Sequence, residues 1–245
     1  MSLSVEWLED ACVVVVLDRP DKRNAVDLTM LRALSAVLAD VKRRESRVMV
    51  LLGAGSAFCS GADLEGVELG EFTETLSSVL AELAALPCLT MAAIEGPALG
   101  AGMQLAAACD LRMATAESPI GVPAVKLGLA VDAWTVERIG QEAGWGTARV
   151  VLLTGEALRA DSMLGGFVHR LAPAGGIRVA AQEWAMHLSA LAPLSVRAHK
   201  LALAHRRGES VDAVEAARLA AWASDDAVEG RRAFRERRRP RFFGR

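Results

Sequence analysis

The stretch GPALGAGMQLAAACDL, Gly96–Leu111, decides the fold of this chain because small residues in it join a strand to a helix. The stretch FCSGADL, Phe58–Leu64, has the same character. At such a turn the first backbone N–H groups of the helix lack partners and can point together at one oxygen. One N–H group from each turn therefore predicts an oxyanion hole for a polarised carbonyl.

The sequence around these two stretches alternates between strand and helix patterns. Short β-branched and apolar runs predict strands at Val13–Leu17, Val48–Leu52 and Leu89–Ile94. Asp27 is placed to N-cap a helix that runs to about Arg43, with leucines at helical spacing. A second helix is expected over residues 72–86. This alternation predicts an α/β core.

The pattern changes after about Trp134, where helical periodicity dominates. Helices are expected at Trp134–Ala143, Thr147–Leu153, Ile177–Leu191, Leu194–His205 and Val211–Ala223, with a short strand at Gly166–Arg170. The last helices have too few long apolar faces to fold alone. We expect residues 1–190 to form the α/β core, and residues 191–245 a helical region that packs on it and on neighbouring subunits.

The amino-acid composition limits the classes of protein to which this chain can belong. The chain has 245 residues, 52% of them hydrophobic, yet no apolar run reaches the ~18–20 residues that a membrane-spanning helix needs. The start carries acidic residues and no basic segment, so no signal peptide is expected. Four scattered cysteines without metal spacing predict reduced core residues, a cytoplasmic location and no metal site. A net charge of −2 predicts no preference of the whole chain for nucleic acid.

The C-terminal tail is locally basic, with eight arginines between Arg231 and Arg245. One interpretation is a solvated helix with a basic end. Another is a phosphate contact, because guanidinium groups match phosphate geometry. Nucleic acid is a third interpretation, but no aromatic residues interleave the charges as a nucleic-acid platform requires.

Four motifs together resemble the crotonase, or enoyl-CoA hydratase/isomerase, superfamily. They are LDRPDKRNAV from Leu17, AFCSGADL from Ala57, the stretch from Gly96 to Leu111, and SPIGVPAVKLGLAVD from Ser118. The basic tail AFRERRRPRF from Ala233 extends the resemblance over nearly the whole chain. The resemblance implies a crotonase-like spiral of ββα units with a C-terminal helical trimerisation region, assembled as a homotrimer or a hexamer. Function must still be argued from the site.

The resemblance also implies where a coenzyme A thioester would bind. The thioester oxygen would be held by the backbone N–H groups of Ala62 and Ala101. Arg237 best matches the residue that contacts the 3′-phosphate, often from a neighbouring subunit, and Arg238 is the adjacent alternative. The other positions implied to contact coenzyme A are Arg23, Asn24, Ala25, Val26, Gly61, Asp63 and Leu64.

The catalytic pattern of the family is broken in this sequence. Hydratases carry two glutamates, and the matching positions here hold Gln104 and Ala124. Neither side chain exchanges a proton near neutral pH, whereas a general acid or base typically contributes about 10²–10⁴-fold to the rate. Gln104 suits hydrogen bonding to a water or to the thioester region; alternatively, it is a polar helix residue that faces a cavity.

Asp132 is the one acidic residue that we expect within reach of the acyl chain. The resemblance allows it to act as a proton shuttle or a nucleophile on the acyl chain. Alternatively, it N-caps a helix that starts near Ala133.

The expected function is that of an acyl-CoA-binding protein in fatty acid metabolism, a carrier or sensor of fatty acyl-CoA with little or no hydratase activity and no bound cofactor. The alternative is an active hydratase/isomerase-type, lyase-like enzyme that uses Asp132 or a water held by Gln104. The candidate lining of the acyl pocket is Met103, Pro123, Leu127, Leu129 and Trp134, although each of these also fits an ordinary core position.

Overall fold

The computed structural model describes residues 2–9, 11–63, 65, 69–205 and 210–245. Its centre is a six-stranded sheet in the order β1-β2-β3-β4-β6-β9. These strands are Leu3–Trp7, Cys12–Leu17, Val48–Gly53, Leu89–Ile94, Leu111–Thr115 and Arg170–Ala172. Only β1 is antiparallel to its neighbour, so the sheet is otherwise parallel. The three strands predicted from apolar runs are confirmed, and they lie side by side at its centre.

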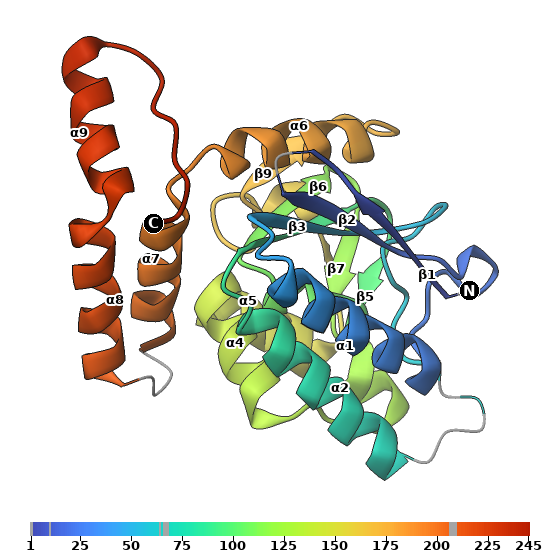
Figure 1. Cartoon of the computed structure of the whole chain (residues 1–245). Coiled ribbons are helices and arrows are strands. Elements are labelled where there is room, and N and C mark those ends of the chain that lie inside the picture. The colour runs from blue at the N-terminus through green and yellow to red at the C-terminus, as the bar shows by residue number, and fades with distance from the viewer. Residues whose placement is uncertain (1, 10, 64, 66–68, 206–209) are drawn as a thin grey trace.

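The sheet is covered on both faces, which explains its continuous apolar strands. All six residues of β2 are buried, because alternate side chains enter two different cores. Helices α1 (Leu28–Arg43), α2 (Leu69–Ala84) and α3 (Ala101–Ala108) cover one face. Helix α6 (Ile177–Ser189) covers the other face, as Figure 1 shows.

Helix α1 illustrates how local sequence sets an element. The Asp27 side chain accepts a hydrogen bond from Met30 N at 2.7 Å, so the predicted N-cap is confirmed. The buried residues of the helix follow at spacings of three and four, and they are Met30, Leu31, Leu34, Leu38 and Val41.

A second sheet, in the order β5-β7-β8, lies beside α3. Its strands are Ala98–Leu99, Pro119–Gly121 and Ala157–Arg159. Short helical turns connect it to the rest of the chain, at Pro123–Leu127 and Ala160–Met163. Helix α4 (Ala133–Ala143) follows the first of these turns and packs against α3.

Several boundaries differ from the sequence-based expectations. The helix expected at Thr147–Leu153 is α5 (Trp145–Arg149) followed by a π-helical turn (Val150–Thr154). The strand expected at Gly166–Arg170 is wrong for most of its length, because pairing with β6 begins at Arg170. Strand β1 was not anticipated; it is an exposed edge strand whose identity depends on pairing with β2.

The C-terminal helices form an arm beside the core. They are α7 (Pro193–His205), α8 (Val211–Ala223) and α9 (Asp225–Glu236). Figure 1 shows α7 and α8 side by side, with α9 continuing beyond α8 and the chain end returning to α7. In the part of the chain that the structure describes, no helix is both long and apolar enough to cross a membrane.

Candidate functional site

Two loops from distant parts of the sequence meet at the start of α3. Cys59 N donates to Pro97 O and Leu99 N donates to Cys59 O, both at 2.9 Å, so residues 59–61 lie against β5. A Cβ atom added to Gly102 would lie 2.3 Å from Cys59 O, so this close approach requires glycine. The two stretches that the sequence singled out are therefore neighbours in space.

The backbone N–H groups of Ala62 and Ala101 are both unused at this junction. Ala101 is the first residue of α3, so its N–H has no acceptor within the helix. Ala62 lies in a single bridge to Val26 whose hydrogen bonds are made by the neighbouring residues, not by its own N–H. Among the described residues, neither N–H has an acceptor. Two such donors on adjacent loops are suited to receive an external oxygen.

Ion pairs fix the loop that carries Ala62. The Arg19 guanidinium binds Asp63 at 2.9 Å and Asp27 at 3.0 Å, and it also donates to Ala25 O at 2.8 Å. The hydrogen bond from Arg19 holds the pKa of Asp63 below its ordinary value. Asp63 thus anchors the loop to the start of α1.

Gln104 lies one helical turn after Ala101, and its side chain is 7% exposed. Strand β7 runs parallel to β5, and Gly100 N donates to Gly121 O at 2.9 Å. The chain that leaves β7 toward half-buried Ala124 therefore starts beside the entrance to α3. Neither side chain at position 104 or 124 titrates near neutral pH.

Asp132 is the N-cap of α4. Its Oδ1 accepts from Thr135 N at 2.9 Å and its Oδ2 accepts from Ser77 Oγ at 3.0 Å. Partial burial raises the pKa of Asp132, but the hydrogen bonds from Thr135 and Ser77 outweigh it and leave the pKa below its ordinary value. Both carboxylate oxygens have structural partners, so the helix-capping interpretation holds for this residue.

The segment expected to contact coenzyme A is mostly structural. Asn24 is fully buried: its Oδ1 accepts from Arg19 N, and its Nδ2 donates to Ala54 O and Ala57 O. Ala25 and Val26 are also buried, whereas Arg23 is exposed. A ligand can therefore reach the Arg23 side chain here. Leu64 lies outside the described residues.

The structure separates Arg237 from the junction around α3. Arg237 is exposed at the C-terminal end of α9, the helix that forms the outer part of the arm (Figure 1). Arg238 pairs with Glu229 and Glu236, each at 2.6 Å, whereas the Arg237 guanidinium has no partner among the described residues. Of the two adjacent arginines, Arg237 is therefore the one free to bind a phosphate.

The residues expected to line an acyl pocket differ in burial. Met103 is 0% exposed within the core, while Leu127 is 64% exposed. Leu129 is also exposed, and Pro123 is half-buried beside Ala124. Half-buried Trp134 lines a cavity beside the arm.

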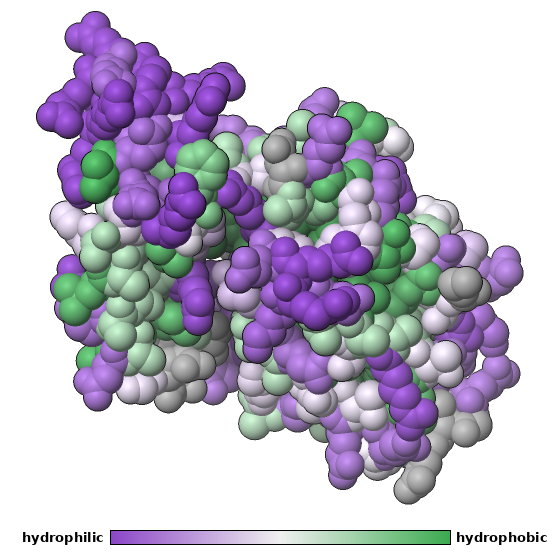
Figure 2. All heavy atoms as spheres, in the orientation of Figure 1, coloured by the Kyte–Doolittle hydropathy of each residue, from purple (hydrophilic) through white to green (hydrophobic). Residues whose placement is uncertain are grey.

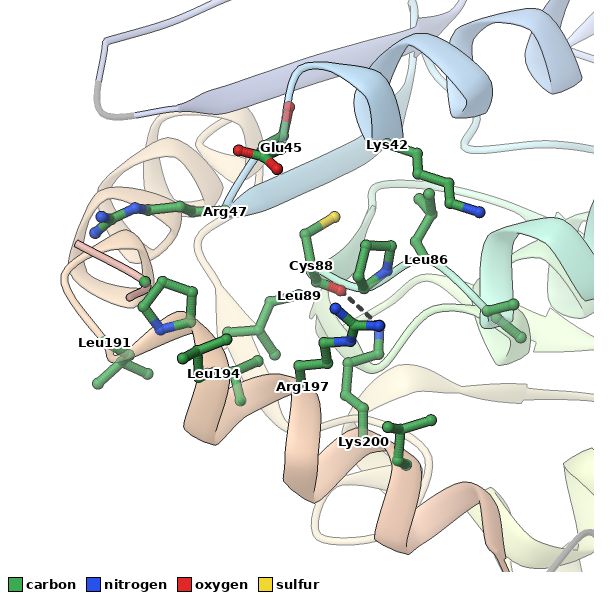
Figure 3. Close-up of a pocket in the computed structure, with 18 of the residues that line it drawn as sticks. Lys42, Glu45, Arg47, Leu86, Cys88, Leu89, Leu191, Leu194, Arg197 and Lys200 are labelled. Atoms are coloured by element: carbon green, nitrogen blue, oxygen red, sulfur yellow. Dashed lines mark hydrogen bonds between the residues drawn. The ribbon is translucent and has the colours of Figure 1, made fainter. Parts of the chain in front are cut away.

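That cavity, of about 780 Å³, lies between the arm and the core. Figure 3 shows α7 contributing Leu194, Arg197 and Lys200, opposite Lys42 and Cys88 of the core. The Lys200 ammonium group donates to Cys88 O at 2.5 Å and pairs with Asp110 at 2.6 Å. These contacts anchor α7 to the core.

Two groups of polar residues near α3 were not anticipated from the sequence. Thr135 accepts a hydrogen bond from Gln104, and Arg112, Arg138 and Glu142 form a buried cluster at the opposite end of α3. Their sequence signal is only a polar residue at a position that faces inward, which is on strand β6 for Arg112 and on α4 for Thr135, Arg138 and Glu142. That signal requires the packing of α3 against α4 to be known.

A family model described as enoyl-CoA hydratase/isomerase matches residues 8–245. The chain belongs to the enoyl-CoA hydratase/isomerase family. The Mycobacterium tuberculosis protein named "Probable enoyl-CoA hydratase echA6" is 35% identical over 240 residues, covering 96% of this chain and 97% of its own. The Mycosarcoma maydis protein named "Enoyl-CoA isomerase/hydratase fer4" is also 35% identical, over 94% of this chain and 92% of its own.

Solved structures of enoyl-CoA hydratases have the same fold as this family member. The Bacillus anthracis enzyme superposes with a TM-score of 0.90 at 27% identity, covering 100% of both chains. The Mycobacterium smegmatis enzyme superposes with a TM-score of 0.89 at 26% identity, covering 99% of both chains. The expected crotonase fold is therefore confirmed.

Proposed function

We propose that this family member binds fatty acyl-CoA thioesters and has little or no hydratase activity, acting as a carrier or sensor in the cytoplasm. The observation that carries the proposal is the pair of unused N–H groups at Ala62 and Ala101 on adjacent loops. Two preorganised donors would hold the thioester oxygen. The two N–H donors that would bind the thioester are therefore present, whereas positions 104 and 124 hold no acid or base that could transfer a proton to or from the acyl chain.

The proposal extends to the assembly. Large apolar side chains are exposed on the arm, including Leu203 at 70%, Trp222 at 67% and Phe234 at 85%. Figure 2 shows apolar residues over the α7 and α8 part of the arm and hydrophilic residues over its α9 end. We propose that these apolar faces are buried in a homotrimer or hexamer, where Arg237 of one copy would reach the 3′-phosphate of coenzyme A bound to another.

The active-enzyme alternative loses support at Asp132. Both oxygens of its carboxylate are used to cap α4 and to hold Ser77. A carboxylate that accepts hydrogen bonds on both oxygens is stabilised in its ionised form. Its affinity for a proton is therefore lowered, and it is a poor proton shuttle. Asp132→Asn is therefore expected to leave any turnover unchanged.

The experiment combines a palmitoyl-CoA titration with a crotonyl-CoA hydration assay. The wild-type protein is expected to bind palmitoyl-CoA and to hydrate crotonyl-CoA no faster than a buffer control. The double variant Gln104→Glu and Ala124→Glu is expected to gain hydration by at least about 10²-fold, because it restores both titratable groups. Rapid turnover by the wild type, or no binding of palmitoyl-CoA, would contradict the proposal.

A further inference from the structure

The cavity between the arm and the core lies at the opposite end of strand β4 from the unused N–H group of Ala101. Leu89, the first residue of β4, lines the cavity, whereas the loop that leads to Ala101 follows Ile94, the last residue of the strand. A strand rises about 3.3 Å per residue, so the length of β4 separates the two places by about 17 Å. Ligands of parallel sheets bind at the carboxyl ends of the strands. The cavity at the amino ends is therefore a separate place.

Three parts of the chain enclose this cavity, and hydrogen bonds fix the third of them. The core and α7 form two walls, and the chain end adds Phe243 and Gly244. The buried Asp226 carboxylate accepts from Phe243 N at 2.7 Å and from Gly244 N at 2.8 Å. Arg47 Nη2 donates to Phe242 O at 2.6 Å. The chain end is thus held where Phe243 lines the cavity.

The size and the apolar walls of the cavity suit a small molecule with a hydrocarbon chain. Its volume of about 780 Å³ falls within the range of about 300–1,000 Å³ that small-molecule sites have. Leucines line it on both sides, Leu86 and Leu89 from the core and Leu191, Leu194 and Leu201 from α7 and the residues before it. A hydrocarbon chain that enters would leave water for these apolar surfaces, which is favourable.

The charges on the lining are unbalanced. Glu45 is the single carboxylate among the lining residues, whereas four side chains are cationic, namely Lys42, Arg47, Arg197 and Lys200. Asp110 neutralises Lys200 at 2.6 Å. The side chains of Arg197 and Lys42 form no ion pair or hydrogen bond with any described residue. Two cations of the lining are therefore left without a counter-ion in the described part of the chain.

These two cations face the cavity from different walls. Figure 3 shows Arg197 beside Lys200 on α7, and Lys42 on the core side. A guanidinium group matches the geometry of a carboxylate, and hydrogen bonds between two charged groups are stronger than those between neutral ones. An anionic head group is therefore the complement of this lining.

We propose that the cavity between the arm and the core binds a single-chain amphiphile with a carboxylate head group, such as an unesterified fatty acid. Arg197 and Lys42 would bind the carboxylate, and the leucines would contact the chain. Because the walls belong to both parts of the molecule, the bound carboxylate would also join the arm to the core. The inference is independent of the acyl-CoA binding proposed at Ala62 and Ala101.

The test measures dissociation constants by calorimetry, with dodecanoate as the probe. The wild type is expected to bind dodecanoate at least about tenfold more tightly than butanoate, because the longer chain buries more apolar surface. Dodecyltrimethylammonium has the same chain with a cationic head, and it is expected to bind at least about tenfold more weakly than dodecanoate, because it meets the same cations.

Two variants test the residues that would hold the head group. Arg197→Gln and Lys42→Gln are each expected to weaken dodecanoate binding by about tenfold, since each removes a charge-assisted bond. Arg149→Gln is the matched control, because Arg149 is an exposed arginine on α5 whose side chain bonds only to Trp145 O among the described residues. It is expected to leave the affinity for dodecanoate unchanged.

Palmitoyl-CoA separates this site from the proposed acyl-CoA site. Arg197→Gln is expected to leave the affinity for palmitoyl-CoA unchanged, and thermal unfolding checks that each variant folds. Equal binding of dodecanoate and dodecyltrimethylammonium, or dodecanoate affinities unchanged in both variants, would overturn the inference. A parallel loss of palmitoyl-CoA binding in Arg197→Gln would also overturn it, because the two ligands would then share one site. If palmitoyl-CoA alone fails to bind, the proposed function fails and this inference stands.

Discussion

Single polar side chains hold the loops of the candidate site in place. Asn24 uses both ends of its amide to join residues 19 and 54–57, and Arg19 joins Asp63 to Asp27. These residues resemble ligand contacts in the sequence, because loops that bind ligands are also rich in polar residues. In the fold they satisfy backbone groups that a tight turn leaves unpaired. These side chains would therefore contribute to binding only indirectly, because they hold the loop that positions the Ala62 N–H.

Asp63→Asn is expected to lower the free energy of unfolding by about 0.5–1 kcal/mol at pH 7. The hydrogen bond from Arg19 holds the pKa of Asp63 low in the folded state, so the unfolded state binds more protons in acid. The stabilisation is present above the ordinary pKa of about 4 and is lost as the pH falls through the lowered value. Urea unfolding at pH 7 and pH 3 measures it.

In this comparison, the difference between wild type and Asp63→Asn is expected to shrink at pH 3. Asp40→Asn, which breaks a surface pair with Arg43, is the control. A difference for Asp63→Asn that stays constant between the two pH values would contradict the account.

At the scale of elements, α3 is held from both ends. Its first N–H faces the site, while two buried arginines bind the carbonyls at its other end. Arg112 Nη1 donates to Cys109 O at 2.7 Å, and Arg138 Nε donates to Ala107 O at 2.6 Å. Cations at a helix C-terminus are favourable both for the unpaired carbonyls and for the helix dipole.

Glu142→Gln is expected to destabilise the protein by about 3 kcal/mol, because it leaves two buried guanidinium groups without a counter-ion. Glu142 lies 2.5 Å from Arg112 and 3.3 Å from Arg138. Glu137→Gln on the exposed face of the same helix is the control, since the Glu137 carboxylate accepts only from Gln141 among the described side chains. Urea unfolding measures both variants, and equal losses of stability would show that the buried cluster contributes little.

The whole molecule is a core with an arm that a few polar contacts attach. Lys200 binds Asp110 and Cys88 O, and Arg47 donates to Phe242 O in the chain end that returns to the arm. The cavity between these contacts is lined by both parts (Figure 3). These contacts therefore help to set the orientation of the arm.

Lys200→Met is expected to speed hydrogen exchange in α7 by about tenfold, because it removes charge-assisted bonds worth about 1.4 kcal/mol or more. Exchange in α1 and α3 should stay unchanged. Lys42→Met is the matched control, since Lys42 lines the same cavity and has no ion pair among the described residues. If both variants exchange alike, Lys200 is not the residue that holds the arm.

The sequence by itself determined the structural features that depend on residues close together along the chain. The buried strands, the Asp27 cap and most helices follow from periodicity and capping, because these forces act within a few residues. The positions of Ala62, Ala101, Gln104 and Ala124 follow from motif order, and the fold brings their stretches together. The family was also readable from those motifs.

Tertiary structure alone decided the roles that depend on partners far along the chain. It joined Asp132 to Ser77, joined Gln104 to Thr135, and placed Trp134 in the cavity beside the arm. Strand β1 and the shifted start of β9 likewise depend on pairing with another strand. A hydrogen bond or a strand pair needs both members, and the second member of each lies on an element whose position only the folded chain defines.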